Sequence, residues 1–179
     1  MQTESVTPIL TDNLTIHDWI NICRKPEDES INIIAANIDK LTDQQCWINL
    51  CDNYNKKVMK IITANVDKLT RTCWVILCRK EYTTDFLQEN IDKFITENEC
   101  FDNMCMTYNN LCIVEEYTEK LTKRGWLILF GNQNAMHLIR PKMTEIKYLL
   151  NQLWHNNNRQ ASELVEEVID TIKHTIKHL

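Results

Sequence analysis

The sequence predicts an all-α protein, an α-solenoid of about five stacked two-helix repeats with a C-terminal amphipathic capping helix. Large aromatic residues recur with a period of about 27 residues, and two short sequence words share this period, which is typical of repeat proteins. The 179-residue chain also contains only 2 Gly and 3 Pro. Sheet-rich folds need more of these residues in their turns, so the composition favours helices.

The first word surrounds the large aromatic residues, which recur at nearly equal intervals and end at Trp154. An apolar residue follows three positions after the first five aromatics, and in four of them a cysteine follows after four. These side chains share one helix face, which we expect in the core rather than in a ligand cage. The predicted structural positions are Trp19, Trp47, Trp74, Phe101, Trp126, Cys23, Cys51, Cys78 and Cys105.

The second word is Asn-x-Asp-Lys followed by an apolar residue, at 37–41, 65–69 and 90–94, with a weaker copy at 117–121. Pairs of apolar residues precede each copy, and Ile38, Val66 and Ile91 within the copies complete a predicted helical stripe. Thr42 follows the first copy with Gln45 three positions later, which predicts an N-cap with a capping box. Thr70 and Thr122 are predicted N-caps as well, and the acids Asp39, Asp67 and Asp92 are predicted structural positions of the repeat.

The predicted domains are a leader at 1–13, a helical repeat domain at 14–154 and an amphipathic helix at 155–179. Isolated helices of this length are marginal in water, so each pair must stack on its neighbours. The last segment carries an apolar stripe near the coiled-coil period. That stripe, which includes Ile169, Ile172 and Ile176, either covers the last repeat or pairs with a second copy of the chain.

Residues 132–139 are Asn-Gln-Asn-Ala-Met-His-Leu-Ile, and Trp-Leu-Ile-Leu precedes them at 126–129. Together with the Asn-x-Asp-Lys words, this pattern resembles the short tandem repeats of proteins from giant DNA viruses of the Mimivirus type. The resemblance covers about residues 14–150, and the chain departs from it at Gln133, where those repeats carry proline, and in its cysteines. It implies helical repeats without an established chemistry, in a viral protein of the infected-cell cytoplasm or the virion.

The charge is uneven, with nine acids and three bases in residues 1–54 and 16 acids and 17 bases in the rest. An acidic front and a near-neutral remainder argue against general nucleic-acid binding. The two glycines, Gly125 and Gly131, cannot form a P-loop or a G-x-G-x-x-G fingerprint. The polar first residues predict no signal peptide, and no apolar run is long enough for a bilayer span. With 8 cysteines as reduced thiols, we expect a cytoplasmic protein.

The cysteines form three C-x4-C pairs, Cys46/Cys51, Cys73/Cys78 and Cys100/Cys105. Residues five apart on a helix point in different directions, so the two thiols of one pair do not converge on one metal ion. Buried structural thiols are therefore predicted, with metal or redox chemistry as the alternative.

Histidine offers the other candidate sites. His174 and His178 lie four residues apart, with Asp170 four before His174, which is a weak metal-binding pattern, although cations near a helix C-terminus need no metal. His17, His137 and His155 are the candidate bases, and no nucleophile elbow accompanies them. His137 is predicted to pack on a hairpin face.

The predicted function is a non-enzymatic scaffold or adaptor that binds another protein and needs no cofactor. Candidate partner-binding residues are Lys56, Lys57, Lys60, Arg79 and Lys80, together with the C-terminal isoleucines. The alternative is a structural protein associated with a virion or capsid, and a metal-binding or enzymatic protein is a third.

Overall fold

The computed structural model describes residues 13–139, and its regular elements are all helical, as the sequence predicts. Within this range no helix is long and apolar enough to cross a membrane. The α-helices are α1 (Ile16–Arg24), α2 (Asp28–Ala36), α3 (Gln44–Asp52), α4 (Val58–Ala64), α5 (Arg71–Leu77), α6 (Thr84–Glu89), α7 (Asn98–Met104), α8 (Leu111–Glu116) and α9 (Lys123–Gly131).

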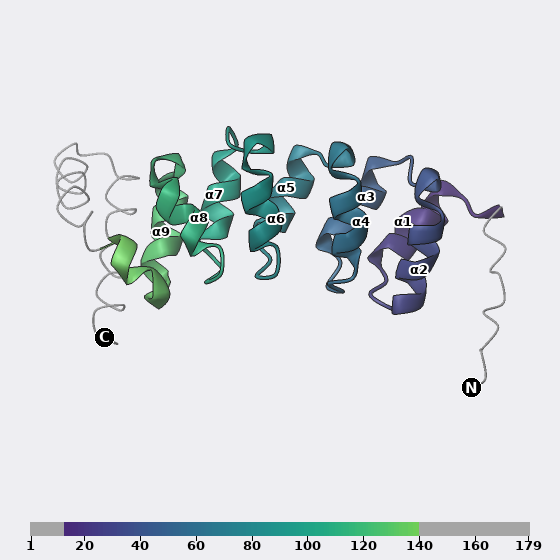
Figure 1. The fold of residues 1–179 in the computed structure, drawn as a ribbon, viewed down its shortest axis with the longest axis horizontal. Helices are drawn as coiled ribbons and strands as arrows, with labels where there is room; N and C mark the ends of the chain where they lie inside the picture. Colours follow the sequence, from purple (N-terminus) through teal and green to yellow (C-terminus); the bar gives the residue numbers. More distant parts are fainter. Residues whose placement is uncertain (1–12, 140–179) are drawn as a thin grey trace, which may run out of the picture. The chain divides into compact units, whose positions relative to one another are not determined.

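The chain divides into two compact units after Cys73, within α5. In the first unit α1 packs against both α2 and α3, and α3 packs against α4 (Figure 1). In the second unit α7 packs against both α8 and α9. Within each unit, helices that carry the first word therefore lie beside one another.

Polar N-caps begin several helices of the first word. Thr15 caps α1 by accepting from the backbone N of Asp18, whose carboxylate accepts from Thr15 N in return, which completes a capping box. Thr122 caps α9 as predicted, through a bond from Arg124 N. The prediction for Thr42 is wrong: Asp43 is the N-cap of α3 and accepts from Gln45 N at 2.7 Å, because its carboxylate reaches the orphan donor at the start of the helix.

The second word forms a helix stop. The Asn side chain donates from Nδ2 to the carbonyl four residues earlier, at 2.8 to 2.9 Å, in Asn37, Asn65 and Asn90. A short 3₁₀ turn follows each of them: Ile38–Lys40, Val66–Lys68 and Ile91–Lys93. The asparagine side chain thus donates a hydrogen bond to a carbonyl that would otherwise have no partner at the end of the helix.

The acids of the second word lie on the surface. Asp39, Asp67 and Asp92 are exposed, and each pairs with the lysine that follows it, at 3.9, 2.9 and 3.3 Å. Exposed pairs of this kind contribute little to stability. The word stabilises the fold through its asparagine and its apolar residues instead.

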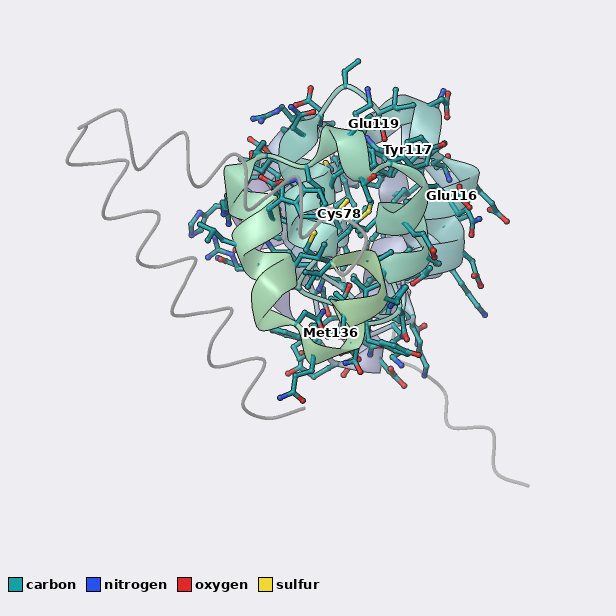
Figure 2. All side chains as sticks on the ribbon, turned by 90° about the vertical axis from the view of Figure 1, so that its left-hand side faces the viewer. Cys78, Glu116, Tyr117, Glu119 and Met136 are labelled. Carbon is teal, nitrogen blue, oxygen red and sulfur yellow. The ribbon has the colours of Figure 1, made fainter. Side chains whose placement is uncertain are left out.

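The first word fills the core. Of its predicted structural positions, all but Trp126 are buried, and Trp126 is half-buried. Cys78 lies in the interior of the second unit, whereas Glu116 and Glu119 lie at its periphery (Figure 2).

The second unit adds a run of contacting rings to this core. Ring centroids lie 5.2 Å apart for Trp74 and Phe94, 6.1 Å for Phe94 and Phe101, and 5.5 Å for Phe101 and Tyr117. Phe94 and Tyr117 belong to the second word, so in this unit aromatic contacts link the two words. At the position of Phe94 the first unit has leucine, Leu41 and Leu69.

Candidate functional site

The turns of the second unit are fixed by asparagine side chains. Asn110 is fully buried, and its Nδ2 donates to the carbonyls of Cys78 and Lys80, at 3.1 and 3.4 Å. Its Oδ1 accepts from the Thr84 hydroxyl at 2.7 Å. Asn109 donates to the carbonyl of Glu81 at 2.9 Å. These bonds tie the turn after α5 and the start of α6 to the turn before α8.

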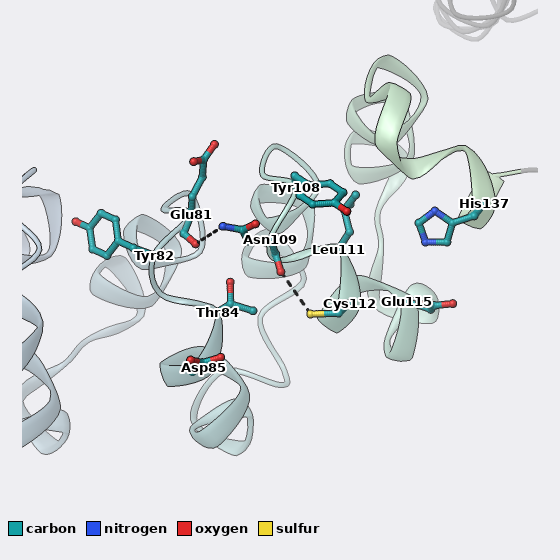
Figure 3. A pocket seen from close by; sticks show the side chains of 10 residues that line it. All are labelled: Glu81, Tyr82, Thr84, Asp85, Tyr108, Asn109, Leu111, Cys112, Glu115 and His137. Carbon is teal, nitrogen blue, oxygen red and sulfur yellow. Dashed lines mark hydrogen bonds between the residues drawn. The ribbon is translucent and has the colours of Figure 1, made fainter. Parts of the chain in front are cut away.

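A groove of about 550 Å³ lies beside these turns. Figure 3 shows Glu81 and Tyr82 toward one end, and Glu115 and His137 toward the other. His137 belongs to a helical segment at 136–139, and its Nδ1 lies 3.1 Å from the Asn134 carbonyl. The groove is lined by Glu81, Tyr82, Thr84, Asp85, Tyr108, Asn109, Leu111, Cys112, Glu115 and His137.

The groove is acidic. Glu81, Asp85 and Glu115 are exposed and line it, and its lining contains no Lys or Arg among the described residues. Tyr108 is 63% exposed, which is unusual for a large ring with an apolar body. Negative charge beside an accessible tyrosine suits a positively charged peptide segment.

Tyrosine recurs at the corresponding turn of other hairpins. Tyr54 stands seven residues after Trp47, as Tyr108 does after Phe101, and Tyr82 stands eight after Trp74. Tyr54 in the first unit is 84% exposed. Tyrosine combines a large contact area with few rotatable bonds and is enriched in binding surfaces.

A second group of chemically active side chains lies in the interior. Of the eight cysteines, seven are buried and Cys112 is exposed. The buried thiols do not pair within a C-x4-C word but between words: Cys23 is hydrogen-bonded to Cys46, and Cys78 to Cys100. Cys51 is hydrogen-bonded to Cys73 in the same way.

Burial sets the pKa of most of these thiols. Loss of solvation raises the pKa of Cys105 to about 12 and also raises the pKa values of Cys23 and Cys78. Cys73 differs, because the hydrogen bond from Cys51 and those from its other neighbours lower its pKa to about 6.

The predicted basic residues are only partly available for a partner. Lys57 is bound to the Asp28 carboxylate, and the Lys80 ammonium lies 5.7 Å from the centroid of the Tyr82 ring. Lys56, Lys60 and Arg79 are exposed. Lys56, Lys57 and Lys60 belong to the first unit, and Arg79 and Lys80 belong to the second. The role of these residues in binding stays a prediction.

One of the two described histidines, His137, lies differently from its prediction. His137 is exposed and lines the groove, so its predicted packing on a hairpin face is wrong. His17 is exposed on α1. In residues 13–139 no group of three His, Cys, Asp or Glu side chains could hold a metal ion. The remaining predicted sites lie outside the described residues: His155, Asp170, His174, His178, Ile169, Ile172 and Ile176.

Comparison with protein-family models, curated proteins and solved structures finds no match to this chain. The fold and the site therefore rest on the chain's own geometry. The resemblance to giant-virus repeats stays a prediction.

Sequence reasoning missed the groove. Stacking of repeats predicts ladders of equivalent cysteines, but it did not predict which thiols are hydrogen-bonded to each other. The groove forms because residues 81–85, 108–115 and 137 meet in space, and their recurrence at close to the repeat period was the available signal. The thiol pairs had a clearer signal, since Cys46, Cys73 and Cys100 follow Cys23, Cys51 and Cys78 at an almost constant interval. Helices that stack one repeat apart bring such positions together.

Proposed function

We propose that this chain is a non-enzymatic protein-binding module of stacked helical hairpins, and that the acidic groove of the second unit receives a segment of a partner protein that carries lysine or arginine. The observation that carries the proposal is the lining of the groove, with three carboxylates, no Lys or Arg among the described residues, and an exposed tyrosine. A volume of about 550 Å³ is within the range of ligand-binding pockets.

The construction of the groove favours binding without large rearrangement. Its wall residues Glu81, Thr84 and Asn109 are bonded to one another or to Asn110 through backbone and side-chain bonds. A preorganised surface loses less entropy on binding than a mobile one. Tyrosines recur at the turns that carry Tyr54, Tyr82 and Tyr108, and repeat proteins bind their partners through extended surfaces of such recurring positions.

A peptide-display library of random sequences tests this proposal on the full-length protein. The library is selected against the wild-type chain and, in parallel, against a triple variant Glu81→Gln, Asp85→Asn and Glu115→Gln. The matched control changes three exposed acids outside the groove, Glu89→Gln, Glu116→Gln and Glu119→Gln, and therefore has the same net charge.

We expect the wild type and the control to recover the same peptides, enriched in Lys and Arg. The groove variant should bind a fluorescent copy of such a peptide at least about tenfold more weakly, as charge pairs that are partly desolvated are lost. Salt should weaken binding to the wild type. Equal binding by both triple variants would show that the peptides respond to overall charge and would contradict the assignment to the groove.

A further inference from the structure

The sulfur of Cys73 has hydrogen-bond partners that the other paired thiols lack. Its Sγ lies 3.5 Å from the Thr70 hydroxyl and 3.9 Å from Nε2 of Gln44. The thiol of Cys51 donates to the same sulfur. One sulfur atom therefore faces a hydroxyl, an amide and a second thiol, and all three can donate a hydrogen bond to a thiolate.

The equivalent cysteines have carboxylates where Cys73 has Thr70. Three residues before Cys46 stands Asp43, and three before Cys100 stands Glu97. Desolvation raises the pKa of Cys46, and the negative charge of Asp43 raises it further. A carboxylate disfavours a neighbouring thiolate, whereas a hydroxyl stabilises one. Within the described residues, the arrangement around Cys73 is thus specific to this pair.

The Cys73 sulfur also lies next to a groove of the first unit. This groove, of about 610 Å³, is lined by Gln44 and Thr70, the two residues whose polar atoms meet the sulfur. Cys73 itself is fully buried, but Gln44 is exposed. A small reagent in the groove therefore reaches the sulfur when these two side chains move aside.

We propose that Cys51 and Cys73 form a redox-active pair in which the Cys73 sulfur reacts with a hydroperoxide and Cys51 converts the product into a disulfide between α3 and α5. The site would thus be an oxidation site of the protein, separate from the peptide groove of the second unit. The proposal does not depend on the proposed binding function.

The chemistry balances in two steps. The Cys73 thiolate attacks one peroxide oxygen, the O–O bond breaks, and the sulfur becomes a sulfenic acid while the other oxygen leaves and takes up a proton. The Cys51 sulfur then attacks the Cys73 sulfur, the S–O bond breaks, and hydroxide leaves as water with the Cys51 proton. In total the two thiols are oxidised to a disulfide, and the hydroperoxide is reduced to water and an alcohol, or to two waters if it is hydrogen peroxide.

The test uses the reduced full-length chain with Cys112→Ser, which removes the exposed thiol. After exposure to equimolar hydrogen peroxide the protein is unfolded and alkylated, and its remaining thiols and cross-linked peptides are identified by mass spectrometry. We expect loss of two thiols and a peptide pair joined through Cys51 and Cys73. Cys51→Ala should instead accumulate a sulfenic acid that dimedone traps.

Cys78→Ala is the matched control, because Cys78 is the residue equivalent to Cys51 one repeat later. It should leave the Cys51–Cys73 reaction unchanged. Thr70→Val should slow oxidation at pH 5 about fivefold, since loss of one donor leaves fewer molecules with the thiolate at this pH, and Thr70→Ser should restore the rate. If the four thiols of the other two pairs disappear as fast as Cys51 and Cys73, or if Thr70→Val reacts as fast as the wild type, the proposal is wrong.

Discussion

The α1–α3 joint of the first unit and the α7–α9 joint of the second unit connect equivalent helices with different chemistry. In the first, the thiols of Cys23 and Cys46 are hydrogen-bonded, and both residues are fully buried. In the second, the residue that precedes the aromatic is Gly125 instead of cysteine. The Cys105 thiol donates to the carbonyl of Phe101 at 3.4 Å instead of meeting a second thiol.

A carboxylate fills the space at the second joint. Asp102 is buried and accepts from Thr122 N at 2.9 Å and from the Thr122 hydroxyl, at the N-terminus of α9. Its counterparts Ile20 and Ile48 in the first unit are apolar. A helix N-terminus favours a negative charge, which compensates for burial of the carboxylate. This joint therefore requires matched volumes and satisfied polar atoms rather than cysteine itself.

Gly125 provides the largest expected effect. A Cβ at this position would overlap Oδ1 of Asp102, so Gly125→Ala must displace the carboxylate from Thr122. We expect a loss of about 3 kcal/mol in the free energy of unfolding, measured by urea denaturation. Gly131→Ala is the control, because a Cβ added at Gly131 would meet no described atom within 4 Å apart from its chain neighbours and the backbone of its own helix. This change should be neutral or stabilising. Equal effects of the two changes would refute the volume match at this joint.

The asparagines that cross the joints are expected to act alike in the two units. Asn53 donates to the Cys23 carbonyl at 3.0 Å across the α1–α3 joint, as Asn132 does to the Cys105 carbonyl at 3.1 Å across the α7–α9 joint. Replacing either with alanine removes the side-chain donor of this carbonyl and should cost about 2 kcal/mol in urea denaturation.

The exposed Asn109 is the control for these asparagines, and Asn109→Ala should cost less than about 1 kcal/mol. A large effect at Asn132 with none at Asn53 would break the similarity of the two joints.

The thiol of Cys73 should make stability depend on pH. Its pKa is lowered from 9.0 to about 6 by the donors Cys51, Thr70 and Gln44. Between these two values the unfolded chain binds the proton and the folded chain does not, so stability rises as the pH increases through this window and is lost as the pH falls through the folded-state pKa.

Thr70→Val removes one donor and should destabilise the protein more at pH 9 than at pH 6, by on the order of 1 kcal/mol. The measurement is urea denaturation of both proteins across this range. A difference that stays constant with pH would contradict a stabilised thiolate at Cys73.

The smallest expected effect concerns one buried oxygen. In the first unit Asn49 donates to the Ile20 carbonyl, and its Oδ1 accepts from Gln45 Nε2 at 3.0 Å. Asn103 donates to the Val75 carbonyl in the second unit, but its buried Oδ1 has no partner among residues 13–139.

Glu99 stands four residues before Asn103, as Gln45 stands four before Asn49, and a carboxylate cannot donate a hydrogen bond to the Asn103 oxygen. Glu99→Gln should therefore stabilise the chain by about 0.5 kcal/mol, and Gln45→Glu should destabilise it by a similar amount, both seen as shifts of the urea midpoint. If neither Glu99→Gln nor Glu99→Ala stabilises the chain, the unpartnered Oδ1 of Asn103 has no measurable energetic cost.

Much of the local structure could be predicted from the sequence. The aromatic and cysteine positions identified the buried helix face, and the apolar pairs before each Asn-x-Asp-Lys word identified the second helix of a hairpin. The sequence misled at residues whose role depends on a single hydrogen bond. Asp43, not Thr42, caps α3. The predicted helical stripe does not continue through Ile38, Val66 and Ile91, because the preceding asparagine ends each α-helix and a 3₁₀ turn follows. Propensity does not distinguish such neighbouring polar residues, because their backbone geometry decides which of them reaches the orphan group.

The helical class, the period and the buried face follow from the spacing of apolar side chains along a helix, which can be read from the residues alone. Helix packing sets which thiol meets which, where carboxylates and tyrosines line a groove, and why Gly125 stands opposite Asp102. Those contacts join residues from different repeats, far apart along the chain. The geometry of these contacts is set by how the helices pack on one another. A periodic pattern requires that the helices pack, but it does not specify the packing geometry.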